Sequence, residues 1–352
     1  MRSRAIIGAL AASFPLIGAA HPPFSTVPAQ SETAPLTDSL GDTADDPAIW
    51  RNPDHPERSL VISTDKKAGL AIHALDGRLL RFEALGKLNN VDLRDGIDIA
   101  AKRQTLVAAS DRSDKKRPVL QLFRLDPEAP MLIPIGSLEM AQGEAYGLCL
   151  YRHGNKVDAI MVYEEGVVEQ VALDLSGPTP KGQSVRRFDL GSRSEGCVVD
   201  DRTGKLYVAE DKVAIWTFQL GPEGAAAPTK FADVDGIRLH KDTEGLALLP
   251  TGRDGGLLFA SSQGNNSFSA FRLPGGAFVG SFRIEGGAID GTEDTDGIAL
   301  DAGDFGTAWP GGLFVAQDGR NRSLSQGKQV RQPQNFKLVP LESILRVIGS
   351  PR

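Results

Sequence analysis

Acidic residues recur at short turns along the sequence, and each turn opens an apolar run. Six such openings pair an acid or a tyrosine with a following Gly or Pro: Asp46-Pro47, Asp95-Gly96, Tyr146-Gly147, Glu195-Gly196, Glu244-Gly245 and Asp296-Gly297. Their second residues lie at positions 47, 96, 147, 196, 245 and 297, a period of about fifty residues. This spacing indicates one structural unit repeated six times, with the openings in equivalent places.

The carboxylates at these openings could bind metal ions together. Two carboxylates about 4 Å apart repel each other by roughly 4 kcal/mol at an effective dielectric near 20, so a converging set needs cations. Ca²⁺ accepts irregular sets of roughly six to eight oxygen ligands, whereas Mg²⁺ needs a stricter octahedron. The alternative is that acid-Gly pairs only form turns, but six in one phase favour a metal site. Further oxygen donors near the openings are Asp45, Asn89, Asn90, Glu144, Asp242, Gln263, Asp290 and Asp294.

Basic residues occupy turns at the same end of the repeat. Lys66 and Lys67 follow the second apolar run of the first unit, and Arg112 follows that of the second unit. Because Lys66 and Arg112 hold matching repeat positions, we expect them near the acidic openings. Ammonium and guanidinium groups bind phosphate oxygens well. The combination with Ca²⁺ predicts a small polyanionic substrate.

The apolar runs that must position these residues alternate with period two and are rich in β-branched and aromatic residues. No segment shows a long 3.6-residue period. Three or four strands in each of six units predict an all-β, six-bladed β-propeller, with a short solenoid as the alternative. Since the first strand of each blade lines the central channel, the acidic openings should converge at one of its ends. The second runs begin at Leu60, Leu106, Ala159, Leu206, Leu257 and Leu313.

The N-terminus indicates export. Arg2 and Arg4, a short apolar stretch and the small residues before position 20 predict a signal peptide over residues 1–20. Residues 21–40 are rich in Pro, Ser and Thr and predict a flexible leader, followed by a propeller over 41–352. A periplasmic or secreted, monomeric protein is expected. The net charge of −6 argues against a nucleic-acid surface, and no run is long enough for a membrane helix.

Two cysteines, Cys149 and Cys197, stand at nearly matching first-strand positions of neighbouring units. Neighbouring inner strands can bring two Cα atoms within the roughly 4.4–6.8 Å that a disulfide needs, and export permits the bond. A disulfide is therefore predicted, with two buried free thiols as the alternative.

Ordered motifs from Asp42 to the C-terminus resemble those of the β-propeller phytases, a family of calcium-dependent alkaline phytases. The stretches that carry the resemblance are Asp42–Trp50, Thr64–Gly69, Asn89–Arg94, Glu195–Cys197, Asp242–Gly245, Ser262–Asn266, Ile289–Thr292, Asp294–Gly297 and Leu313–Asp318. The resemblance implies a phosphoric monoester hydrolase of the 3-phytase type. Such an enzyme converts phytate, often as its calcium salt, to lower inositol phosphates with several Ca²⁺ ions.

Site residues follow from the resemblance position by position. It implies a water bridged between Ca²⁺ ions that attacks phosphorus in line, without a covalent nucleophile. It implies phosphate contacts from Lys66, Arg112 and Tyr146, with Lys67 as a further candidate. These three, with Glu195, form the expected catalytic set. The implied calcium ligands are Asp45, Asp46, Glu195, Asp211, Asp242, Glu244, Gln263 and Asp290.

One position departs from the family pattern. Glu164 occupies a place where many relatives carry a Lys that contacts a second phosphate, which predicts weaker phytate binding here. Two other functions fit parts of the sequence. A lactonase or phosphotriesterase-like propeller would lack a phosphate grip such as Lys66 with Arg112, and a non-catalytic binding propeller would have no reason to collect acids at one end.

Overall fold

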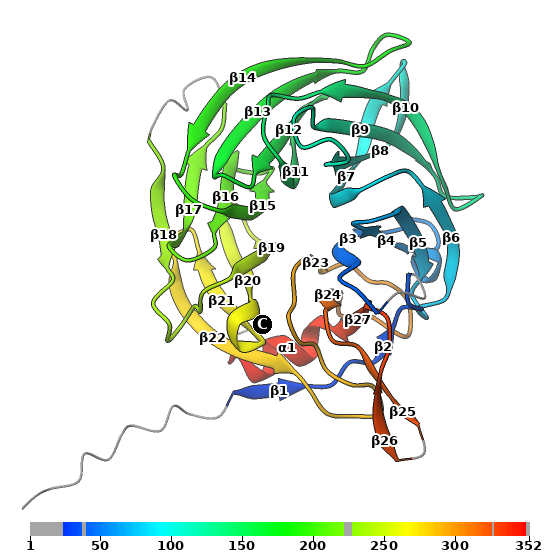
Figure 1. The fold of residues 1–352 in the computed structure, drawn as a ribbon, viewed down its shortest axis with the longest axis vertical. Helices are drawn as coiled ribbons and strands as arrows, with labels where there is room; N and C mark the ends of the chain where they lie inside the picture. The colour runs from blue at the N-terminus through cyan, green and yellow to red at the C-terminus, as the bar shows by residue number, and fades with distance from the viewer. Residues whose placement is uncertain (1–23, 37–39, 222–226, 326, 350–352) are drawn as a thin grey trace, which may run out of the picture.

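The computed structural model describes residues 24–36, 40–221, 227–325 and 327–349. Six sheets stand radially around a common axis, so the predicted six-bladed β-propeller is confirmed (Figure 1). Blade one consists of β3 (Ala44–Trp50), β4 (Leu60–Asp65), β5 (Gly69–Ala74) and β6 (Leu79–Ala84). Blade two consists of β7 (Leu88–Ile99), β8 (Lys102–Asp111), β9 (Val119–Asp126) and β10 (Met131–Glu139). Blade three consists of β11 (Ala145–His153), β12 (Lys156–Tyr163), β13 (Val167–Asp174) and β14 (Lys181–Asp189).

The remaining blades include two strands from the N-terminal segment. Blade four consists of β15 (Ser194–Asp200), β16 (Lys205–Glu210), β17 (Ala214–Gln219) and β18 (Thr229–Asp233). Blade five consists of β19 (Thr243–Thr251), β20 (Gly255–Ser262), β21 (Ser267–Leu273), β22 (Ala277–Ile284) and β1 (Ser25–Val27). Blade six consists of β23 (Ile298–Asp301), β24 (Leu313–Asp318), β27 (Asn335–Pro340) and β2 (Ser31–Glu32). Outside the blades are the hairpin β25 (Arg322–Ser325) with β26 (Lys328–Arg331), the helix α1 (Leu341–Val347) and the 3-10 turns η1 (Pro56–Arg58) and η2 (Gln263–Asn265).

The apolar core lies between neighbouring blades. Ile62 and Leu70 of blade one, for example, pack in one buried cluster with Val107 and Phe123 of blade two. Because both faces of each central strand are covered, these strands are buried almost throughout, as β4 and β12 are. Their rigid packing fixes the turns at the ends of the channel.

Each inner strand of the first five blades begins with an irregular step in its pairing. The shift lies between Ala44 and Pro47 in blade one, and at corresponding points in blades two to five. A Cβ at Gly147 would lie 1.8 Å from the backbone oxygen of Glu195, so this crowded step requires Gly. Six residues hold the equivalent place at this end of the channel: Asp45, Asn89, Tyr146, Glu195, Glu244 and Asp296.

The predicted opening of blade two is corrected. Asn89 and Asn90 take that place, because the Asn90 amide donates to Ser110 Oγ as the Gly245 amide donates to Ser261 Oγ. The Asp95-Gly96 pair lies at a second irregular step near the far end of the long strand β7. Acid-Gly pairs suit both kinds of step, so the sequence pattern could not separate them.

The described part of the predicted flexible leader is ordered, and that prediction is corrected there. Strand β1 pairs in parallel with β22, and β2 pairs with β27 as the outermost strand of blade six. The apolar side chains of Val27 and Leu36, within this otherwise polar segment, are buried in the apolar clusters of the blades. Strand β2 thereby completes blade six beside the C-terminal strand β27. The predicted signal peptide, residues 1–20, lies outside the described residues.

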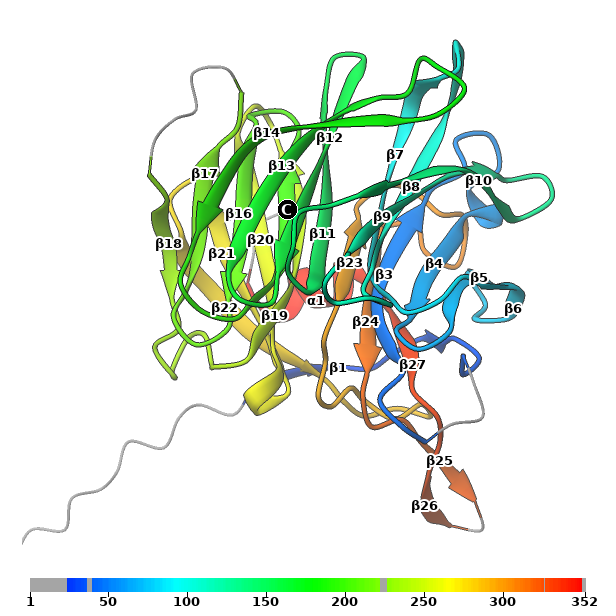
Figure 2. The same cartoon turned by 45° about the horizontal axis from the view of Figure 1, so that its top comes forward.

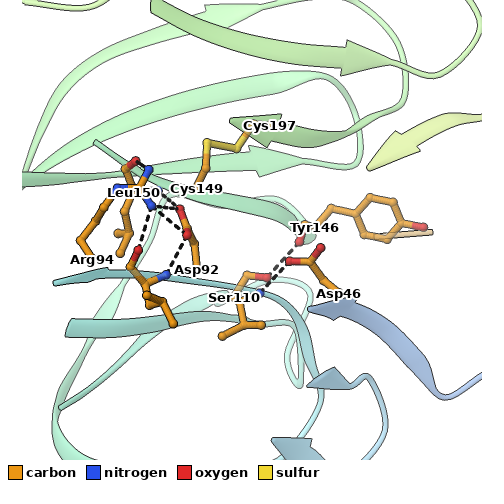
Figure 3. The surroundings of a disulfide bond; sticks show 10 residues. Asp46, Asp92, Arg94, Ser110, Tyr146, Cys149, Leu150 and Cys197 are labelled. Carbon is orange, nitrogen blue, oxygen red and sulfur yellow. Dashed lines mark hydrogen bonds and ion pairs between the residues drawn. A yellow bond between two sulfur atoms is a disulfide. The ribbon is translucent and has the colours of Figure 1, made fainter. Parts of the chain in front are cut away.

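The disulfide prediction is confirmed. Cys149 on β11 and Cys197 on β15 are bonded, with their Cα atoms 5.8 Å apart. Figure 3 shows the bond beside a second link, in which Asp92 accepts from the Leu150 amide and Arg94 donates to the Leu150 carbonyl oxygen. Blades two, three and four are therefore fixed to one another along their inner strands. Within the described ranges, no helix has the length and apolar character needed to cross a membrane.

Candidate active site

A cavity of about 560 Å³ lies at the end of the channel where the inner strands begin. Its floor is formed by five of the six equivalent residues at the strand starts, so the repeat itself assembles the site. The lining residues are Asp42, Asp45, Lys66, Tyr146, Arg193, Glu195, Glu244, Gln263, Asp294, Asp296, Gly319, Arg320, Arg322, Arg331 and Gln334.

Lys66 is the central cation of this floor. Its Nζ atom lies 2.8 Å from Asp45 Oδ1 and 2.9 Å from carboxylate oxygens of both Asp42 and Asp296. Burial by itself lowers the pKa of Lys66, but the carboxylates outweigh burial and raise that pKa well above its usual value. Lys66 is therefore a permanently charged group at the bottom of the cavity.

The carboxylates around Lys66 are crowded and poorly solvated. Burial raises the pKa of Asp45 to about 6, that of Asp296 to about 7 and that of Glu244 to about 8. Burial also raises the pKa of Glu195 well above its usual value, and the neighbouring Glu244 adds to this effect. Lys66, together with Arg193 at 4.0 Å from both Glu195 and Glu244, does not balance all of these acids.

Asn89 connects two of these carboxylates. Its side-chain nitrogen lies 2.8 Å from Asp45 Oδ2 and 2.8 Å from Glu195 Oε1. An amide at this position of the ring lowers the repulsion between its neighbours, because it donates to both of them.

An aromatic ring between two guanidinium groups forms one wall. Arg112 lies 5.4 Å and Arg193 lies 5.1 Å from the centre of the Tyr146 ring, and Arg193 also donates to the Tyr146 hydroxyl. Burial raises the pKa of Tyr146 further above its ordinary value, so its hydroxyl remains protonated and can donate. This wall offers several hydrogen-bond donors to an anion.

The structure brings most of the predicted site residues together. Asp45, Lys66, Tyr146, Glu195, Glu244 and Gln263 line the cavity directly. Arg112 and Asp211 stand behind this lining. Arg112 contacts Tyr146, and Asp211 Oδ2 lies 3.1 Å from Arg193 Nε. Asp242 is beside Gln263, whose backbone N–H donates to the backbone carbonyl oxygen of Asp242.

Three predicted residues lie elsewhere. Asp46 turns deeper into the channel, where its Oδ2 accepts from the Val91 amide. Lys67 is exposed, and only its backbone amide bonds to Asp65. Asp290 is paired with the fully buried Lys337, outside the cavity lining.

Other lining residues were not among the predicted site residues. Asp296 was expected in the acidic set because it opens the sixth unit, but the family resemblance gave it no individual role. Asp42 and Arg193 lie three and two residues before an equivalent position, where no repeat pattern marks them. Arg320, Arg322 and Arg331 belong to the β24–β27 connection, which has no counterpart in the other blades.

The donor set suits a hard cation such as Ca²⁺. It consists of carboxylate and amide oxygens, and Asn89 Oδ1 and Asp211 Oδ1 are buried without a hydrogen-bond partner. In the described ranges, however, no three His, Cys, Asp or Glu side chains already converge as metal ligands, because Asp45 and Asp296 point to Lys66. Cation binding therefore requires some of these carboxylates to reorient.

Similarity to known proteins agrees with this site. A family model described as Phytase matches residues 4–351. The 3-phytase of Bacillus subtilis (strain 168) is 39% identical to the chain over 333 residues, which cover 92% of this chain and 85% of that protein. The chain belongs to the phytase family. It is therefore a hydrolase of phosphoric monoesters, and the resemblance inferred from its motifs is confirmed.

The cavity of this phytase limits the chemistry available to it. Among the described lining residues there is no Ser, Thr, Cys or His, so a hydroxyl, thiol or imidazole nucleophile of those residue types is absent from this lining. A second cavity, of about 640 Å³, lies at the other mouth of the channel. Two of its four arginines, Arg94 and Arg202, are paired with aspartates.

Proposed function

We propose that this phytase hydrolyses the phosphate monoesters of phytate in a Ca²⁺-dependent reaction, by direct attack of water on phosphorus. The observation that carries the proposal is the placement of Lys66, Arg112 and Tyr146 beside a ring of crowded carboxylates. Cations and neutral donors bind the phosphate, while the carboxylates hold the metal. The products are inorganic phosphate and lower inositol phosphates.

Ca²⁺ is assigned to the carboxylate ring and the acids next to it. Bound there, it would neutralise these side chains and supply positive charge to the phosphate oxygens and to the attacking water. Asp290 differs from the others, since its carboxylate already faces the Lys337 ammonium. The proposed ligands in and around the cavity are Asp45, Glu195, Asp211, Asp242, Glu244 and Gln263, with Asp46 as a further ligand deeper in the channel.

The chain's own residues orient the phosphate and stabilise its charge. Arg112 and the Tyr146 hydroxyl donate to phosphate oxygens from the wall, and Lys66 places its charge at the floor. Glu195 is the assigned acceptor for the proton of the attacking water: Asn89 donates to its Oε1, and Ca²⁺ bound among the neighbouring acids would keep this carboxyl ionised and able to accept. Phosphoryl transfer needs mostly positioning and charge stabilisation, which this arrangement supplies.

Export to the periplasm or the medium belongs to the same proposal. It is supported by the predicted signal peptide and by the disulfide between Cys149 and Cys197, a bond typical of oxidising compartments. The substrate is a small polyanion, which needs neither a nucleic-acid surface nor a membrane. A monomer is sufficient, because one chain closes the whole ring.

The deciding experiment measures phosphate release from phytate by the purified protein, with added Ca²⁺ and after exhaustive chelation. We expect release only with Ca²⁺, and a loss of at least tenfold in turnover for Arg112→Ala, with partial recovery in Arg112→Lys. Arg78→Ala, at an exposed surface pair with Asp76, is the matched control and should behave as wild type. Equal phosphate release with and without Ca²⁺ would overturn the calcium assignment, and no release from phytate under any condition would overturn the substrate.

A further inference from the structure

A hairpin without a counterpart in the other blades has its base at the edge of the active-site cavity. Strands β25 and β26 lie between β24 and β27 of blade six and project away from the body of the propeller (Figures 1 and 2). Both sides of its base are near the cavity, because Gly319, Arg320, Arg322, Arg331 and Gln334 all belong to the lining.

The base of the hairpin is held firmly. The Gln332 amide donates to the Asn321 carbonyl oxygen at 2.8 Å, and Asn321 Nδ2 donates to the Pro333 carbonyl oxygen at 2.7 Å. Gln334 Oε1 accepts from the amides of Thr43 and Ala44 at 2.6 and 2.9 Å. These bonds tie the base of the hairpin to the start of blade one, directly beside Asp45, so this base is fixed at the edge of the cavity.

Two of the three arginines on this rim are neutralised, and the third is not. Arg320 pairs with Asp294, and Arg322 makes a two-bonded pair with Glu293. Arg331 has no carboxylate partner in the described part of the chain and is exposed. It also stands directly opposite Arg322 in the hairpin ladder. Like charges opposite each other on paired strands are unfavourable, so Arg331 is an uncompensated cation.

The position of Arg331 complements the wall at Tyr146. Blade six is opposite blade three in a ring of six, so Arg331 faces the cavity from the side across from Tyr146, at the start of blade three. A guanidinium group binds phosphate through two parallel hydrogen bonds. A substrate with phosphates around a compact ring could present one group to the Tyr146 wall and another to the hairpin.

We propose that Arg331 binds a phosphate group of the substrate other than the one being cleaved, and so favours polyphosphorylated substrates over simple monoesters. The inference rests on the proposed function, since it assumes cleavage at the Tyr146 wall. Arg331 lies in a hairpin outside the repeat, whereas the cleavage site is formed by residues of the repeated strands.

The test compares Arg331→Ala, Arg331→Lys and Lys328→Ala with wild type. Lys328 is the matched control, since it is an exposed cation of the same hairpin that does not line the cavity. With Ca²⁺ present, KM and kcat are measured for phytate and for p-nitrophenyl phosphate, and phytate binding is measured by calorimetry. Unchanged thermal unfolding of the variants establishes that they are folded.

We expect Arg331→Ala to raise KM for phytate and weaken phytate binding about tenfold, which is roughly 1.4 kcal/mol, with kcat within about twofold. Arg331→Lys should fall between wild type and Arg331→Ala. KM for p-nitrophenyl phosphate should change little, because that substrate has no second phosphate. A similar rise in KM for both substrates, no rise for phytate, or an equal effect of Lys328→Ala would overturn the inference.

Failure of the proposed function gives a different result. If wild type does not release phosphate from phytate, the function is wrong, and calorimetry alone then decides the role of Arg331. Weaker phytate binding by Arg331→Ala than by Lys328→Ala supports the inference in that case. Equal binding, or no binding of phytate by wild type, overturns it.

Discussion

Lys66 and Asp296 are separated by 230 positions in the sequence, yet Lys66 Nζ lies 2.9 Å from Asp296 Oδ2 at the floor of the cavity. Lys66 follows a strand of blade one, and Asp296 precedes the inner strand of blade six. The contact therefore exists only when the first and last blades meet. The catalytic floor depends on ring closure, which the N-terminal strand β2 completes.

Replacing Lys66 with Met should impair both catalysis and stability. Turnover of phytate should fall by roughly 10²-fold or more, a typical loss when one preorganised charge-stabilising donor is removed. Without Ca²⁺ the free energy of unfolding should fall by about 3 kcal/mol, because buried carboxylates lose their partner. Kinetic assays and denaturant unfolding check these values. Lys67→Met is the control, and an equal loss in that variant would contradict the central role of Lys66.

The metal-free protein should lose stability as pH rises. The folded-state pKa values of Asp45, Asp296 and Glu244 are raised to about 6, 7 and 8, above the ordinary values near 4. These groups therefore favour the folded state fully below pH 4, and this contribution is lost as pH rises to about 8.

Thermal unfolding in chelator from pH 5 to pH 9 measures this dependence. The midpoint should fall steadily up to about pH 8, and saturating Ca²⁺ should remove most of the fall, because ligand binding to the folded state stabilises it. A metal-free midpoint that does not change across this range would show that the carboxylates are not crowded in solution. Asp45→Asn should flatten the metal-free curve.

Replacing Glu164 with Lys should strengthen phytate binding. The Glu164 carboxyl is hydrogen-bonded to the Glu144 carboxyl. Glu144 also contacts Lys115 and Arg112. Burial raises the pKa of Glu164, and the hydrogen bond with Glu144 raises it further. Because the two hydrogen-bonded carboxyl groups share a proton, the pair keeps one negative charge, which disfavours a phosphate beside Arg112. Reversing one contact charge is worth about 1–3 kcal/mol, so KM for phytate should fall about tenfold.

Glu164→Gln is the matched variant, since it removes the charge without reversing it and should give a smaller decrease. KM for a monophosphate substrate should change little in either variant. Equal changes for both substrates, or none for either, would show that no second phosphate approaches Glu164.

Lys337 should be essential for stability and dispensable for chemistry. Its side chain is fully buried and contacts Glu32 on β2, Asp290 and Asp318. Lys337→Met should lower the free energy of unfolding by about 3–5 kcal/mol, because these carboxylates lose their partner, while kcat for phytate below the unfolding transition stays near that of wild type. Urea unfolding measures the loss. Stability like that of the surface variant Lys328→Met would contradict this role.

The sequence alone was enough to predict the repeat, the propeller and six of the fifteen residues that line the cavity. Period-two apolar runs at a spacing of about fifty residues leave few other folds, because each sheet must bury both faces against its neighbours. The residues at the strand starts followed from that repeat, so Asp45, Glu195 and Glu244 were found. The disulfide followed from the same argument, since Cys149 and Cys197 stand at neighbouring inner strands.

Tertiary structure alone decided what lies outside the repeat. The second unit opens at Asn89 and not at Asp95, because two irregular steps in β7 carry similar sequence signals. The N-terminal segment is ordered only because blades five and six offer edges and apolar surface to it. Arg193 and Arg331 reach the cavity from positions with no repeat partner. A repeat pattern specifies the equivalent places in a ring, whereas contacts across the ring depend on how the whole chain closes.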